Sequence, residues 1–251
     1  MKRFFLRFAA ALTLLLGTAA AVQAQSASFA AIDSLRAAAE YDEALARLEA
    51  RADAQGRSAE VLWRTARTRV DRAGELEESE RRKEQFRQAL KEARAAVEKV
   101  PRSADAHLSL AVAAGRVGLT SGTQKKVELS RAVKKHVDRA IELNPQSDLA
   151  YHVRGRWNYE VANLGWFART VVKAVYGGLP DASFEQAAED LKQALRIEER
   201  VAHHLELGKA YAKLDNEAKA RKHFKRALAL PNNDADDPDY KKEVRERLEE
   251  L

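Results

Sequence analysis

The chain has 251 residues, of which 44 are Lys or Arg and 38 are Asp or Glu, so its formal net charge is +6. It has no cysteine, which excludes a disulfide framework, a lipid-modified amino-terminal cysteine and a thiol nucleophile. The charges are interleaved along the chain as on solvated helix faces, which argues against the concentrated basic surface that nucleic-acid binding requires.

The first 24 residues have the pattern of a secretory signal peptide. Three basic residues, Lys2, Arg3 and Arg7, precede an apolar run that ends near Val22, and we expect cleavage after Ala24. Their removal lowers the net charge from +6 to +3. A retained anchor and a mitochondrial presequence are the alternatives, although the apolar run is shorter than the roughly 20 residues that a membrane span needs. We therefore expect an exported protein, periplasmic or secreted, with no stable membrane anchor after cleavage.

The mature chain has the apolar spacing of helices and of one repeated helix pair. From Phe29 onward, apolar residues recur every three or four positions, which predicts helices and no strands. Four segments share the spacing of small and large residues found in the tetratricopeptide repeat (TPR). These residues are Ala89, Ala93, Ala96 and Pro101; Val133, Val137, Ala140 and Pro145; Ala187, Leu191 and Ala194; and Gly208, Tyr211, Ala220, Phe224 and Ala227. Since one such hairpin cannot bury its own apolar faces, stacked hairpins are expected.

The predicted fold is all-α, a TPR-like α-solenoid of about five helical hairpins with a C-terminal capping helix, in one domain over residues 25–251. The hairpins are expected at residues 28–55, 60–100, 104–144, 148–199 and 201–230, and the capping helix at residues 238–251.

The intervals between equivalent alanines predict that two or three hairpins are lengthened. Ala96 and Ala140 are 44 residues apart, and Ala140 and Ala194 are 54 apart, against about 34 in an ordinary repeat. We expect one helix from about Asp148 to Val175, covered on two sides, in which the aromatic residues mainly pack.

Three stretches carry a resemblance to a known family. They are VLWRTAR, which contains Trp63, Arg64 and Arg67; VKKHVDRAIELNPQSDLAYHVRGRW; and VANLGWFARTVVKAVYGGLPDASFEQAAEDL, with LELGKAYAKL after it. Over residues 60–230 the chain resembles the regulator of microtubule dynamics family of TPR-like proteins. The resemblance implies a helical-repeat scaffold without known catalytic residues, whose animal members are associated with microtubules and mitochondria. An exported, bacterial-type member would not meet a microtubule, so only the fold and the scaffold role are carried over.

No catalytic, cofactor or metal motif is predicted. His203 and His204 are adjacent, but they have neither HExxH spacing nor a supporting carboxylate motif. The segment from Gly118 to Lys126 lacks the spacing of a phosphate-binding loop. The acidic run from Glu77 to Glu84 alternates with basic residues, as on an exposed helix face.

A concave groove is the predicted binding site. The first helix of each hairpin lines the concave face of a TPR solenoid, and the repeat register places nine residues there. They are Arg64, Thr68, Leu108, Val112, His152, Arg156, Tyr159, Lys209 and Lys213. Arginine suits carboxylates and tyrosine adds rigid contact area, so the expected partner is a protein or peptide that is acidic or carboxylate-bearing. The open alternative is that these residues form salt bridges within the solenoid and bind no ligand.

The predicted function is a non-enzymatic exported scaffold that binds a partner in this groove. The alternative is a helical hydrolase, or a substrate-positioning accessory subunit of an envelope enzyme complex, that uses His152 and a nearby carboxylate. An enzyme predicts a pocket in which ionisable groups of perturbed pKa converge, whereas a scaffold predicts an open groove.

Overall fold

The computed structural model describes residues 29–251, so the predicted signal peptide lies outside the described residues. Within residues 29–251 the chain forms helices and no strand, which confirms the all-α prediction. The helices are an opening segment at residues 29–37, α2 (Tyr41–Gln55), α3 (Ala59–Gly74), α4 (Ser79–Lys99), α5 (Ala104–Leu119), α6 (Thr123–Leu143), α7 (Asp148–Ala162), α8 (Trp166–Tyr176), α9 (Phe184–Ile197), α10 (Val201–Lys213), α11 (Glu217–Ala229) and α12 (Asp237–Glu249).

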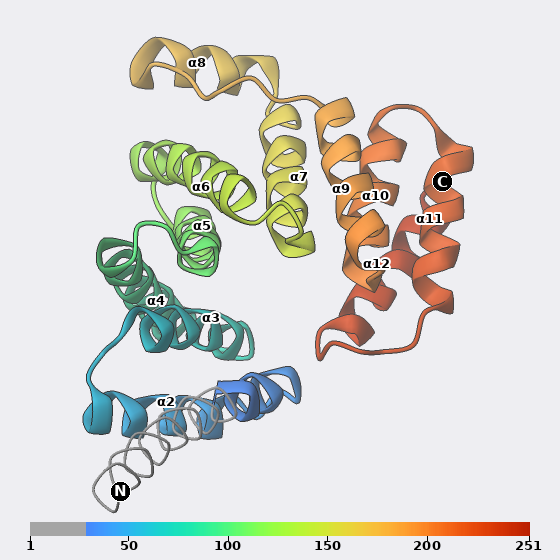
Figure 1. Cartoon of the computed structure of the whole chain (residues 1–251). Coiled ribbons are helices and arrows are strands. Elements are labelled where there is room, and N and C mark those ends of the chain that lie inside the picture. The colour runs from blue at the N-terminus through green and yellow to red at the C-terminus, as the bar shows by residue number, and fades with distance from the viewer. Residues whose placement is uncertain (1–28) are drawn as a thin grey trace, which may run out of the picture.

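The helices stack as antiparallel pairs along a curved array (Figure 1). Helix α3 pairs with α4, α5 with α6, α7 with α9, and α10 with α11. The first helices also contact one another from pair to pair, α3 with α5, α5 with α7 and α7 with α10, and α12 packs on α10 and α11 at the end. This arrangement is the predicted TPR-like solenoid with its capping helix.

Four serines begin four of these helices. Ser58, Ser103, Ser147 and Ser183 stand directly before α3, α5, α7 and α9, and each hydroxyl accepts a hydrogen bond from the backbone amide three residues later. Such an N-cap satisfies one of the free amides of the first turn and stabilises a helix by about 1 kcal/mol. The starts of three consecutive first helices are therefore fixed by the same local device.

Two glycines set how closely the paired helices approach. A Cβ added at Gly208 on α10 would lie 2.3 Å from the ring of Phe224 on α11, and one added at Gly155 on α7 would lie 2.7 Å from Leu191 on α9. Ala220 and Phe224 are buried on the same interface. The spacing that identified the repeat in the sequence is thus the spacing of small residues against large ones between paired helices.

The expected single helix from Asp148 to Val175 is wrong. Helix α7 ends at Ala162, three non-helical residues follow, and α8 begins at Trp166. Arg169 of α8 turns back and donates hydrogen bonds to carbonyl oxygens at the end of α7 and in the break. These bonds satisfy carbonyls that a continuous helix would have paired internally, so the interruption is stabilised.

The aromatic residues of this region divide into two groups. Trp157 and Tyr159 of α7 are buried, as expected, but Trp166 and Phe167 of α8 are 79% and 66% exposed. Helix α8 projects from the array, and among its residues only Val172 is buried (Figure 1). The extra residues of this hairpin therefore form a protruding helix, whereas α4 and α6, with 21 residues each, are lengthened second helices.

Replacing Gly208 with alanine tests the close approach of α10 and α11. The added Cβ would overlap the Phe224 ring, and overpacking of this kind costs about 1–3 kcal/mol of unfolding free energy. Urea denaturation followed by circular dichroism measures the loss. Gly115→Ala in α5 is the matched control, because its Cβ would lie 3.8 Å from Val133 and the change should stabilise the helix by roughly 1 kcal/mol. Equal effects of the two substitutions would contradict the assigned contact.

Candidate functional site

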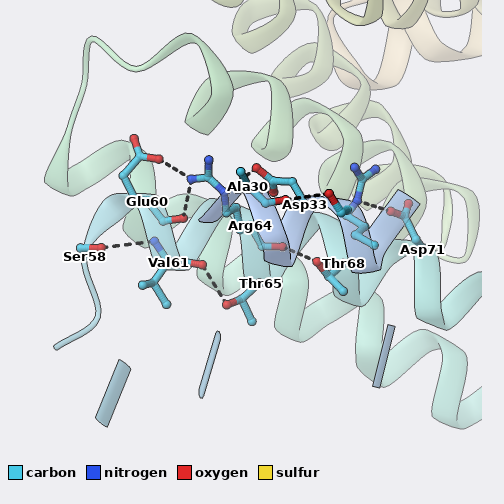
Figure 2. Close-up of polar contacts among 11 residues, drawn as sticks. Ala30, Asp33, Ser58, Glu60, Val61, Arg64, Thr65, Thr68 and Asp71 are labelled. Atoms are coloured by element: carbon cyan, nitrogen blue, oxygen red, sulfur yellow. Dashed lines mark hydrogen bonds and ion pairs between the residues drawn. The ribbon is translucent and has the colours of Figure 1, made fainter. Parts of the chain in front are cut away.

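Arg64 of the predicted groove forms contacts with two neighbouring elements. Its Nε donates to the carboxylate of Asp33 on the opening helix at 3.0 Å, and its Nη1 donates to Glu60 one turn earlier in α3 (Figure 2). The guanidinium also stacks on the rings of Phe29 and Trp63, with centroid distances of 4.3 and 4.0 Å. Arg64 therefore links the first two hairpins of the described chain.

The predicted groove residues of α7 and α10 form a second set of contacts between hairpins. Arg156 lies 3.4 Å from Glu206, and Lys209 lies 3.1 Å from Glu206 and 3.3 Å from Glu243 of α12. Tyr159 is buried, with the ammonium group of Lys209 5.6 Å from its ring centroid. The structure thus brings these three predicted residues together, in a network that joins α7, α10 and the capping helix.

The other predicted groove residues differ in burial and in whether they already have a hydrogen-bond or ion-pair partner. Thr68 is buried and donates to the carbonyl oxygen of Arg64, and Leu108 is buried in the main core, with Val112 partly buried against it. Lys213 at the end of α10 is exposed, and within residues 29–251 it has no hydrogen bond or ion pair. Partner binding by this set stays a prediction, and Lys213 is the member whose charge is left free.

Arg67 of α3 is a residue that the predicted groove set did not include. It is part-buried on α3, and its guanidinium has no hydrogen bond or ion pair to any described residue, although it lies 5.9 Å from the Trp63 ring centroid. Burial, and next the positive charge of Arg36, lower its pKa to about 10. A desolvated cation without a paired anion is costly.

The sequence contains only a weak signal for Arg67. Arg67 stands three residues after Arg64 and near the same tryptophan, Trp63. Spacing alone therefore predicts similar roles for the two arginines. The difference arises because Asp33 and Glu60 are both within reach of Arg64. Glu60 lies one turn before Arg64 on α3 itself, whereas Asp33 is brought there by the stacking of the opening helix, which the repeat pattern does not specify.

All six histidines of the chain form three pairs across helix interfaces. The pairs are His107 with His136, His152 with His203, and His204 with His223, with Nδ1 to Nδ1 distances of 2.8, 3.0 and 2.9 Å. Pair members come from different helices and are 19 to 51 residues apart in the sequence. Sequence spacing predicts no histidine site and gives no signal for these pairs, because the stacking of helices brings their members together.

The proton arrangement of each pair follows from its oxygen partner. His107 bonds the carbonyl oxygen of Pro101 through Nε2, and His203 and His204 bond carboxylates in the same way. An oxygen acceptor requires a proton on Nε2, so the neutral ring accepts at Nδ1 from the Nδ1–H of its partner. If the pair binds one more proton, the hydrogen bond between the two Nδ1 atoms can persist. If it binds two, both Nδ1 atoms carry a proton and the two N–H groups repel each other.

His152, the residue of the hydrolase alternative, lies in one of these pairs. It contacts His203, whose Nε2 lies 3.1 Å from Asp148, and Arg200 also donates to Asp148 at 2.8 Å. Burial, and next the charge of His203, lower the pKa of His152 well below its usual value. Although burial raises the pKa of Asp148, hydrogen bonds from His203 and Arg200 lower it to about 2. The carboxylate is therefore ionised and occupied by contacts between helices.

Among residues 29–251, no group of three or more ligating side chains is placed to hold a metal ion. In the same range, no helix combines the length and the apolar character needed to cross a bilayer.

Comparison with known proteins identifies relatives of the chain. The family model described as Regulator of microtubule dynamics protein 1-3 matches residues 28–251. Regulator of microtubule dynamics protein 3 of Xenopus laevis is 33% identical over 195 residues, which are 75% of this chain and 41% of that protein. Regulator of microtubule dynamics protein 1 of Bos taurus is 32% identical over 197 residues, 77% of this chain and 62% of that protein. The chain thus spans less than two thirds of the length of these curated relatives.

A solved structure supports the same fold. TTC0263, a thermophilic TPR protein of Thermus thermophilus, superposes with a TM-score of 0.62 at 19% identity. The match covers 90% of this chain and 97% of the other. It confirms the TPR-like architecture.

The histidine pairs predict that the protein loses stability in mild acid. Burial, and next the paired ring, lower the pKa of His136 and of His223 to about 4. The unfolded chain, with histidine pKa values near about 6.5, binds more protons, so stability is full above that pH and is lost as the pH falls toward about 4. Allowing for solvent screening of the part-exposed rings, the unfolding free energy should fall by about 1–3 kcal/mol between about pH 7 and 4.5. Urea denaturation at each pH measures it.

His136→Asn is the informative variant, because an amide can donate to His107 but does not titrate in this range. Its stability should fall less steeply with acid than that of the wild type. Lys99→Gln, an exposed change at the end of α4, should leave the slope as it is. A wild-type stability independent of pH over this range would contradict the assigned pairs.

Proposed function

This chain belongs to the regulator of microtubule dynamics family, and from that premise we propose that it is a non-enzymatic scaffold that binds a protein or peptide on its concave face. The relatives are named as regulators, and the fold is that of TPR proteins. Stacked hairpins present one continuous surface of first helices, which suits an extended partner.

The observation that carries this proposal is the unpaired guanidinium of Arg67. Its charged surroundings lie on the first helices: Arg36 on the opening helix lowers its pKa, while Asp71 of α3 and Asp105 of α5 raise it without forming an ion pair. A partner carboxylate placed there would supply the missing bidentate contact. An acidic or carboxylate-bearing segment is accordingly the ligand class that we assign to the groove.

The paired residues have a supporting role in this proposal. Arg64, Arg156 and Lys209 each hold a carboxylate of a neighbouring helix. Breaking one of these part-buried pairs would leave an unpaired charge behind. They therefore fix the relative positions of the hairpins, while Arg67 and Lys213 retain charge for a partner.

The same reasoning favours a scaffold over a hydrolase. The groups with perturbed pKa values near His152 are packed between α7 and α10 and hold one another. Their contacts account for the shifts without a substrate. We assign these residues to the stability of the helix interface.

We further propose that the protein acts outside the cytoplasm. Lys2, Arg3 and Arg7 followed by an apolar run and a small-residue cleavage site are the support for export. The chain has no cysteine, so its folding there would not depend on oxidation.

Substituting Arg67 and Lys213 with glutamine tests the groove. Wild type and Arg67→Gln/Lys213→Gln are used to capture proteins from envelope extracts, and quantitative mass spectrometry compares the bound sets. Recovery of the specific partner should fall at least about tenfold, since removing one member of a desolvated charge contact costs about 2–5 kcal/mol. Lys222→Gln/Lys225→Gln on the outer helix α11 carries the same change in charge and should capture as the wild type does. Equal recovery by all three proteins would refute the groove.

Export is tested by the amino terminus of the mature protein. The full-length chain, expressed in a bacterial host, should be recovered from the periplasm or medium with Gln25 as its first residue, as determined by intact mass. A chain that starts at Met1 and stays with the membrane fraction would instead support the retained-anchor alternative.

A further inference from the structure

A basic cleft lies on the opposite side of the array from the groove. It has a volume of about 540 Å³ and lies between α4 and α6, the second helices of two consecutive hairpins, with the end of α5 between them. Both second helices lie on the outer side of the array, at the left in Figure 1. The volume falls within the roughly 300–1,000 Å³ that is usual for ligand sites.

One face of α4 forms a wall of the cleft. Arg87, Lys91, Arg94 and Glu98 recur every three or four residues, so their side chains line one stripe of the helix. The stripe is about 16 Å long at a rise of about 1.5 Å per residue. All four side chains are exposed, so the cleft is shallow and elongated. Its shape suits a segment laid along α4 better than an enclosed small molecule.

The lining of the cleft carries more positive than negative groups. Arg87, Lys91 and Arg94 of α4 and Lys125 in the first turn of α6 line it, and Glu98 is the single carboxylate of the lining. Arg87 and Lys125 are ion-paired with Glu84 and Glu128 on their own helices. Lys91 and Arg94 have no hydrogen bond or ion pair with any residue in the range 29–251. Burial, and next the charge of His107, are the main causes that lower the pKa of His136 on α6, and Arg94 lies near enough to add to the effect. Among the described residues of the lining, the cations without an ion-pair partner are therefore Lys91 and Arg94, both on the α4 wall.

The floor of the cleft is apolar. Leu90 of α4 and Val117 of α5 line it and are themselves buried, and Ala95 is part-buried beside them. An apolar side chain of a ligand could cover this floor while acidic groups on either side meet the cations. An apolar floor with cations beside it favours a ligand that carries both apolar and negatively charged groups.

We propose that this cleft is a second docking surface, and that its occupant is an acidic amphipathic helical segment of a partner protein. Carboxylates spaced by one helical turn on the partner match the spacing of the cations on α4. An apolar residue between them covers Leu90 and Val117, and Glu98 at one end favours a basic residue there and so sets the direction of the segment. The surface is separate from the concave groove, so one scaffold can hold two partners at once.

Fluorescence anisotropy with a labelled synthetic peptide tests the proposal. The peptide is a helix with glutamates and leucines on one face, and a scrambled peptide of the same composition is the reference. Wild type should bind the patterned peptide at least about tenfold more tightly than the scrambled one, a difference of about 1.4 kcal/mol. Lys91→Glu/Arg94→Glu should abolish this preference, because each reversal removes an attraction and adds a repulsion.

Two control variants make the result specific. Lys222→Glu/Lys225→Glu reverses two exposed lysines with the same spacing on α11, which have no ion pair among the described residues, and should bind as the wild type does. Arg67→Gln should also bind normally, which distinguishes a failure of this surface from a failure of the groove. Thermal melts verify that each variant is folded.

Several outcomes would overturn the proposal. Equal affinity for the patterned and scrambled peptides would show that the cleft does not bind the segment specifically. A preference that persists in Lys91→Glu/Arg94→Glu would show the same. Loss of the peptide in Arg67→Gln would place it in the groove. Binding to phosphatidylglycerol vesicles that depends on Lys91 and Arg94, without peptide binding, would assign the cleft to a membrane surface.

Discussion

The contact of a small residue with a large one between paired helices is the constraint on which the rest of the structure depends. Gly208 admits the ring of Phe224, and Gly155 admits Leu191, so the helices of each pair approach closely enough to exclude water. A pair built in this way still has apolar faces to cover, and only the next pair can cover them. Curvature, the concave face and the outer clefts all follow from that repeated close approach.

Stacking also explains why polar residues are paired across helix interfaces. Arg64 with Asp33, Arg156 with Glu206 and Lys209 with Glu243 each join helices of different hairpins, where both members lose part of their hydration. The histidine pairs likewise join different helices, with the Nδ1 atoms of two rings within hydrogen-bond distance of each other. Charge is left free only where stacking supplies no counter-ion, as at Arg67.

The sequence predicted the fold well apart from one break, and it gave no signal for several contacts around the candidate site. Apolar spacing and the positions of Gly208, Ala220 and Phe224 were sufficient for the repeat, because close helix packing constrains residue size at fixed intervals. The break after Ala162 was missed, since a continued helix and a helix interrupted by a returning Arg169 have the same apolar period. The histidine pairs and the free state of Arg67 depend on contacts between segments tens of residues apart, which no local pattern encodes.

The two faces of the array differ for a structural reason. First helices contact one another along the concave side, so their charged residues meet across hairpins and mostly neutralise each other. Along α4, the outward stripe of Lys91 and Arg94 has no such counter-ions, and the cleft beside α6 collects positive potential above an apolar floor. Affinity on the concave side would therefore rest on a single desolvated arginine, which favours one well-placed carboxylate. On the outer side it would rest mainly on the solvated cations Lys91 and Arg94, which favours a longer acidic segment and makes binding there the more sensitive to salt.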